Sequence, residues 1–68
     1  MALAELDVVE LAVQTGRWPA GTEGTVLERG DQSVLVEISD ERGHTLEIVS
    51  VPADALRRVA TPQQQALL

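Results

Sequence analysis

The alternation of apolar and polar residues predicts a chain built from short β-strands. Between residues 33 and 39, Val34, Val36 and Ile38 occupy every second position, which is the period of a strand with one buried face. Similar apolar runs predict three further strands, at 24–29, 44–51 and 57–59. Near its end, the run 44–51 is apolar on both faces, which indicates cover on both sides or a bulge that shifts the phase.

The first apolar run, residues 6–13, fits two types of element. Val9, Leu11 and Val13 would form one face of a strand that begins at Asp7. Leu6, Val9 and Val13 also have the spacing of one helix face. Three of the eight residues are β-branched valines, which favour extended structure. The pattern therefore predicts a fifth strand, with a helix as the alternative.

The stretch 19–26 is the bend around which the strands are arranged. Pro19 lacks an N–H donor and interrupts any ladder, while Gly21 and Gly24 can adopt a positive φ at little cost. Glycines that feed a strand in this way are typical of a tightly curled small barrel, where a bend requires a residue without Cβ. We therefore expect Gly21 and Gly24 to have structural roles.

A long connection, residues 14–22, holds the single aromatic residue of the chain. Long ordered loops often carry function. Trp18 could pack into the core or stand exposed as an anchor for a partner, and packing is favoured because no Phe or Tyr supplies bulk. Trp and Arg are enriched at the centres of protein interfaces, so Arg17 and Trp18 are the candidate partner-binding residues.

The remaining connections are short turns. Residues 40–43 predict a type I turn that ends on a left-handed Gly43, and residues 52–56 predict a 3₁₀ turn after Pro52. Residues 60–68 form a polar tail that we expect to be frayed and disordered. The alternative for this tail is a short helix capped by Thr61, which only a partner would stabilise.

This order of elements predicts an all-β fold, a small five-stranded SH3-like barrel with a long first loop and a 3₁₀ turn before the last strand. The barrel would comprise residues 1–59, followed by the tail. Closure of the barrel would remove exposed strand edges, which a domain this small has reason to avoid.

Composition narrows the function classes. The 68 residues allow a single domain, and the formal net charge of −6, from 11 acidic residues and five arginines, argues against nucleic-acid binding. The same charge would steer the domain towards a basic partner, and it is equally accounted for by solubility alone. The chain lacks cysteine, a membrane-length apolar segment and a signal-peptide pattern, so we expect a cytoplasmic protein without contact to membranes.

Groups that could carry out catalysis are scarce. The chain has one His, no Cys and no Tyr, so we expect no enzyme activity and no cofactor. His44 with Asp40 offers too few ligands for a metal site. The glycine loop lacks the Gly-Lys-Ser/Thr ending of a phosphate cradle, and Glu23 would repel phosphate.

Asp7 is the carboxylate with the clearest structural role. At the start of the first strand, it can accept backbone N–H groups from a neighbouring loop. Arg57 and Arg58 flank the closing strand and could pair with Asp7 or with Glu10, and such surface pairs contribute under about 1 kcal/mol each.

Three motifs resemble a bacterial family of small proteins classed as a domain of unknown function. They are L-D-x-V-x-L at 6–11, G-T-x-G-T-V at 21–26 and D-x-L-R-x-V at 54–59, and the likeness extends over about residues 5–59. The resemblance implies an SH3-like fold and carries no catalytic residues. Members look like companions of small toxin-like proteins, which implies an antitoxin or immunity role. The central motif also resembles loops in ribosomal and translation-factor SH3-like domains and in the nitrile hydratase β subunit.

These observations lead to one main hypothesis and two alternatives. We expect a non-enzymatic protein–protein interaction module that binds a basic partner, with antitoxin or immunity protein as its most concrete form. The alternatives are a nucleic-acid or ribosome-associated module and an accessory domain that shapes the active site of another subunit. Surplus valine on the strand faces also makes a homodimer through an edge strand an open prediction.

Overall fold

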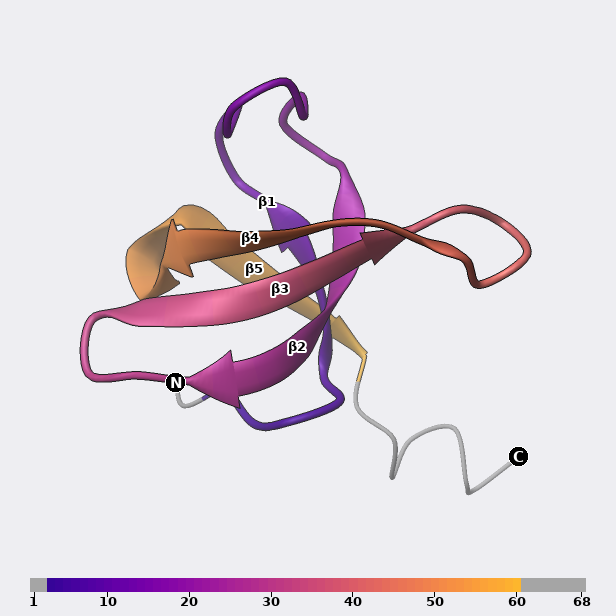
Figure 1. The fold of residues 1–68 in the computed structure, drawn as a ribbon. Coiled ribbons are helices and arrows are strands. Elements are labelled where there is room, and N and C mark those ends of the chain that lie inside the picture. The colour runs from indigo at the N-terminus through magenta and orange to yellow at the C-terminus, as the bar shows by residue number, and fades with distance from the viewer. Residues whose placement is uncertain (1–2, 61–68) are drawn as a thin grey trace.

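The computed structural model describes residues 3–60, and these form one antiparallel five-stranded sheet (Figure 1). The elements are β1 (Val8–Leu11), β2 (Glu23–Arg29), β3 (Ser33–Ser39), β4 (Thr45–Pro52), the 3₁₀ turn η1 (Ala53–Ala55) and β5 (Leu56–Ala60). The hydrogen-bonded order is β4-β3-β2-β1-β5. This order, the long first loop and the 3₁₀ turn before the last strand confirm the fold class predicted for an SH3-like barrel.

Four of the five strands agree with the prediction to within about one residue, whereas β1 is shorter than the run that predicted it. Leu6 has a φ of 70° and lies in a turn, so the extended segment begins only at Val8. Val9 and Leu11 are buried, as the strand pattern requires, but Val13 is exposed beyond the end of β1. The helix alternative for this segment is therefore wrong.

Three irregularities in register bend the sheet. The pairing shifts between Val8 and Val9 in β1, between Val26 and Glu28 in β2, and between Ile38 and its neighbour Ser39 in β3. A bulge adds a residue to one strand and increases its local twist and bend. The bulge between β3 and β4 lies at Leu46, before the end of 44–51 that is apolar on both faces, so it does not shift the phase of that end. There Val49 and Val51 face the core and Ile48 is exposed.

The core lies on the concave face of this bent sheet and is built from aliphatic side chains. Its buried members are Leu3, Val9, Leu11, Val26, Val34, Val36, Ile38 and Val51. Trp18, Val49, Ala55 and Leu56 are partly buried and pack against this cluster. The branched residues at alternate positions of β3 thus supply the centre of the core, because every second side chain of a strand points to one face.

The sheet has two free edges among the described residues. β4 ends the sheet on one side and β5 on the other, with no ladder joining them. The expectation that barrel closure removes the edges is therefore not met by hydrogen bonding. A free edge strand presents a row of unpaired backbone groups, so each edge is a place where another chain could add.

The predicted tail falls almost entirely outside the part of the chain that the structure describes. β5 continues to Ala60, one residue past the predicted end of the barrel, and residues 61–68 are not described. Over residues 3–60, no helix has the length and apolar character needed to cross a bilayer.

Candidate functional site

The long loop between β1 and β2 presents Arg17 and Trp18 on a tight turn of its own. The backbone N–H of Thr15 donates to the Trp18 carbonyl at 2.8 Å, and the Trp18 N–H donates back to Thr15 at 2.9 Å. Gly16 allows this closure with a φ of 57°, in the left-handed region that favours glycine. In Figure 1 the loop projects from one end of the sheet.

Both side chains of this turn reach Glu47, the third residue of β4. The Trp18 indole N–H donates to Glu47 Oε1 at 2.8 Å, and the Arg17 Nε lies 3.4 Å from the same oxygen. The Arg17 guanidinium also stacks 4.6 Å from the centre of the Trp18 ring, within range for a cation–π interaction. We call Arg17, Trp18 and Glu47 the loop clamp, because together they hold the long loop against β4.

The position of Trp18 combines the two alternatives that the sequence left open. Its ring is half-buried and packs against the core, while its polar edge reaches an exposed carboxylate. The proposed partner-binding role of Arg17 and Trp18 stays a prediction. The Trp18 indole N–H and the Arg17 Nε already face Glu47, so both residues contribute to the position of the loop.

Three large apolar side chains stand exposed on β3 and β4. Leu35 is 38% exposed, Leu46 48% and Ile48 53%. Ile48 pairs with Glu37 of β3 and lies on the convex face, whereas Leu46 lies at the bulge between Thr45 and Glu47 and has no register partner. Leu35 pairs with Ser50 of β4 and therefore shares that face. We call Leu35, Leu46 and Ile48 the apolar stripe.

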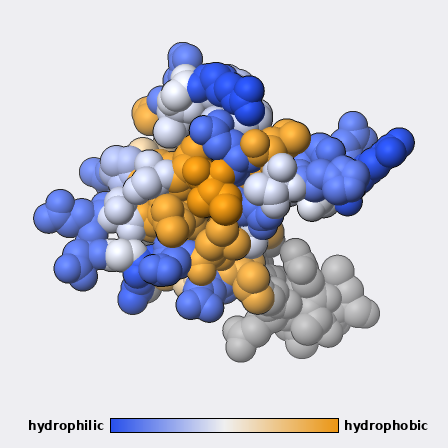
Figure 2. All heavy atoms as spheres, viewed as in Figure 1, coloured by the Kyte–Doolittle hydropathy of each residue, from blue (hydrophilic) through white to orange (hydrophobic). Residues whose placement is uncertain are grey.

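The charged neighbours of the apolar stripe are acidic. Glu37 is the register partner of Ile48, and Glu28 is the register partner of Leu35. Thr45 donates its hydroxyl hydrogen bond to the Glu37 carboxylate. Figure 2 shows an apolar band across the middle of the molecule, over β3 and β4, with hydrophilic side chains around it. The convex face of β3 and β4 thus presents an apolar centre beside negative charge.

Asp7 directly precedes β1 and has a structural role there. Its side chain is buried, and the backbone N–H of Ala4 donates to Asp7 Oδ2 at 2.9 Å. Arg58 Nη1 lies 4.0 Å from the same oxygen, and Arg57 pairs with Glu10 at 3.3 Å. Asp7 therefore fixes the turn that precedes β1.

The three glycines singled out from the sequence act in two ways. Gly21 and Gly43 have φ values of 91° and 85°, in the left-handed region expected for them. Gly24 does not have a positive φ. The lack of a Cβ matters at Gly24 because β3 approaches it too closely to leave room for one.

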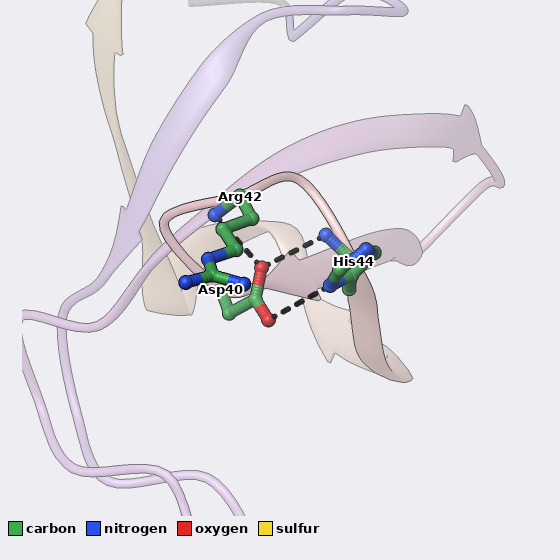
Figure 3. Close-up of polar contacts among 3 residues, drawn as sticks. All are labelled: Asp40, Arg42 and His44. Atoms are coloured by element: carbon green, nitrogen blue, oxygen red, sulfur yellow. Dashed lines mark hydrogen bonds and ion pairs between the residues drawn. The ribbon is translucent and has the colours of Figure 1, made fainter.

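The turn between β3 and β4 is organised by Asp40 (Figure 3). The backbone N–H groups of Arg42 and His44 both donate to Asp40 Oδ1 at 2.9 Å, and His44 Nδ1 lies 3.3 Å from Oδ2. The hydrogen bond from the His44 backbone is the main cause that lowers the pKa of Asp40 below its ordinary value of 3.8. These bonds stabilise the turn, and within residues 3–60 no cluster of three His, Asp or Glu side chains could hold a metal ion.

Glu47 and the apolar stripe are the residues that sequence reasoning missed. The apolar pattern on both faces of 44–51 was the only signal for the stripe. Nothing in the sequence links Glu47 to Trp18, which lies 29 positions away. No protein-family model, curated protein or solved structure matches the chain. The resemblance to the bacterial family therefore stays a prediction from its motifs.

Proposed function

We propose that this chain is a non-enzymatic protein-interaction module that binds a basic protein partner in the cytoplasm through the convex face of β3 and β4. The observation that carries the proposal is the apolar stripe of three exposed aliphatic side chains, in which Leu35 is in register with Glu28 and Ile48 with Glu37. Exposed apolar groups rimmed by polar residues are typical of protein interaction sites.

The energetics of the stripe suit a modest, specific contact. Complete burial of a Leu or Ile side chain contributes about 1.5–3 kcal/mol, so the exposed halves of Leu46 and Ile48 would each contribute about 1 kcal/mol. Glu28 and Glu37 would add attraction for arginine or lysine at the rim and repulsion for acidic proteins. Specificity for a basic partner then comes from charge, and affinity from the apolar centre.

The same charges weigh against the alternative of a nucleic-acid module. A phosphate backbone is bound by clustered Arg and Lys, whereas the stripe lies beside carboxylates and the chain has a net charge of −6. The antitoxin or immunity role is the most concrete form of the proposal. It is supported by the motif resemblance, and a basic toxin-like protein would be the partner.

A capture experiment with matched variants tests this function. The purified chain is immobilised and exposed to a lysate of its source organism, and each captured protein is then produced pure and its binding measured. We expect a basic protein that binds the natural chain and loses binding to Ile48→Lys. Val13→Lys is the control, because Val13 is a comparably exposed residue, 56% accessible, that lies outside β3 and β4.

Two results would contradict the proposal. One is a purified partner that binds Ile48→Lys and Val13→Lys with equal affinity. The other is retention of RNA by the natural chain in a low-salt filter-binding assay. Circular dichroism of both variants shows whether each keeps the β-structure of the natural chain.

A further inference from the structure

We propose that the partner binds by adding a strand along the free edge of β4, and that this strand is an extended segment in which apolar residues alternate with arginine or lysine. The inference rests on the proposed function and specifies its mode. In strand addition, main-chain hydrogen bonds supply affinity and alternate side chains supply specificity.

β4 is the better suited of the two edges. It has eight residues, whereas β5, at the other edge, has five. β5 also carries Arg57 and Arg58, which would repel a basic segment. Pro52 ends β4 and has no N–H to donate, so the added strand would pair within residues 45–51.

The side chains of β4 specify what the added strand must carry. Paired residues of an antiparallel ladder place their side chains on the same face. A residue paired with Ile48 would therefore meet apolar surface on the convex face, a residue beside Leu46 would meet apolar surface at the bulge, and the residue paired with Glu47 would meet a carboxylate. A segment that reads apolar, basic, apolar satisfies all three positions.

The Glu47 carboxylate has an exposed oxygen that could bind a second cation. Both groups of the loop clamp contact Oε1, and no hydrogen bond or ion pair of residues 3–60 involves Oε2. The Glu47 side chain is 45% exposed, so an arginine or lysine of the added strand could reach Oε2. Because the clamp already holds this carboxylate in place, less side-chain entropy is lost on binding.

A second copy of the chain fits this edge poorly. Two β4 strands related by a two-fold axis would match Leu46 with Ile48 only in the register that centres on Glu47. That register places the two Glu47 carboxylates opposite each other, which is destabilising. It also brings together two chains of net charge −6. The acidic edge therefore favours a basic partner over self-association.

The test uses the full chain and a blocked synthetic peptide in which valine and arginine alternate. Binding is followed by amide hydrogen exchange in NMR spectra. We expect exchange of the β4 amides that face the free edge to slow roughly tenfold at saturation, because they gain hydrogen-bond partners. A peptide with glutamate in place of arginine, and one with N-methylated backbone, serve as the matched controls and should not bind.

Variants of the chain assign the two kinds of contact. Ile48→Thr keeps a β-branched residue and should weaken peptide binding about fivefold through lost apolar burial. Glu47→Gln keeps the acceptor for Trp18 and should weaken binding about threefold, and only at low salt. Val59→Thr on β5 is the control, since Val59 is 47% exposed at the opposite edge, and it should bind as the natural chain does.

Any other result overturns the inference, and each such result also shows whether the proposed function still stands. If the peptide or a purified partner contacts the apolar stripe without protecting any β4 amide, strand addition is wrong and the proposed function stands. If the peptide does not bind while a basic partner does, the partner uses another mode. If β4 amides are protected without ligand in a species of doubled mass, the occupant is a second copy.

Discussion

Gly24 lies so close to Val36 that a Cβ added at position 24 would be 2.5 Å from Val36 Cγ1 and 2.8 Å from the carbonyl oxygen of Glu37. Real Cβ atoms do not approach other heavy atoms this closely. The close approach comes from the pairing of β2 with β3, in which Thr25, the neighbour of Gly24, pairs with Glu37. A single hydrogen atom in place of a side chain therefore permits the two strands to approach.

Replacement of Gly24 by Ala should destabilise the fold by about 3 kcal/mol, the upper end of the cost of overpacking, because the obstructing Glu37 atom belongs to the backbone. Urea unfolding followed by circular dichroism measures the change. Gly16→Asn is the control, since a Cβ there meets nothing within 4 Å and Asn tolerates a φ of 57°. Equal unfolding midpoints for the two variants would show that β2 and β3 lie farther apart.

The loop clamp should be detectable as a coupling between two side chains. Trp18→Phe removes the donor to Glu47 and keeps most of the ring, so it should cost about 1 kcal/mol, the typical net contribution of one hydrogen bond. Glu47→Ala should cost a similar amount, and the double variant should cost less than the sum of both. Strictly additive unfolding free energies would contradict the contact.

Arg17 should matter much less to stability than Trp18. Its guanidinium is mostly exposed, with 68% of the side chain accessible, so the ion pair with Glu47 contributes under about 1 kcal/mol. Arg17→Ala should lower the unfolding free energy only slightly, and high salt should remove the difference. A large loss that persists in salt would indicate that stacking on the indole dominates.

Asp7→Ala should destabilise the chain by about 1–3 kcal/mol, because it leaves the Ala4 N–H without its acceptor and removes the charge beside Arg58. Asp7→Asn should cost less, since the amide oxygen can still accept from Ala4. Thermal unfolding of the two variants gives the comparison. If Asn costs more than Ala, the cause lies elsewhere than in this hydrogen bond.

The β3–β4 turn should weaken in acid. Because the pKa of Asp40 is lower in the folded chain, its carboxylate contributes stability that is present above the ordinary value of 3.8 and lost as pH falls through the folded value. The first cause is the backbone N–H of His44, so His44→Ala should keep most of the depression. Carboxyl-carbon NMR titration measures it, and an ordinary pKa in His44→Ala would assign the effect to the imidazole.

The parts of this structure that sequence reasoning could predict are those that depend on local pattern. The period of β3 set its bounds, and Gly43 marked the left-handed end of a turn, because neighbouring residues alone determine these features. The bend near Gly24 and its need for a residue without Cβ were expected from the sequence. The neighbouring strand that leaves no room for a Cβ is β3, and no local pattern records that contact.

The candidate site was harder to predict because it depends on which face of the sheet is covered. Ile48 and Leu35 read like residues of covered strands, and they are exposed because they lie on the face opposite the core. The contact from Trp18 to Glu47 depends likewise on the path of the long loop. Composition identified Trp18 as important, whereas only the folded structure shows that it contacts Glu47.

The loop clamp has a practical consequence for the study of this protein. Since Trp18 is the sole Trp, Tyr or Phe residue, all near-ultraviolet absorption and fluorescence of the chain originate from one indole ring, which is hydrogen-bonded to Glu47 of β4. Emission from that ring is a built-in optical reporter of the edge strand. Binding of a partner at β4 can therefore be followed in unlabelled protein through the fluorescence of this single residue.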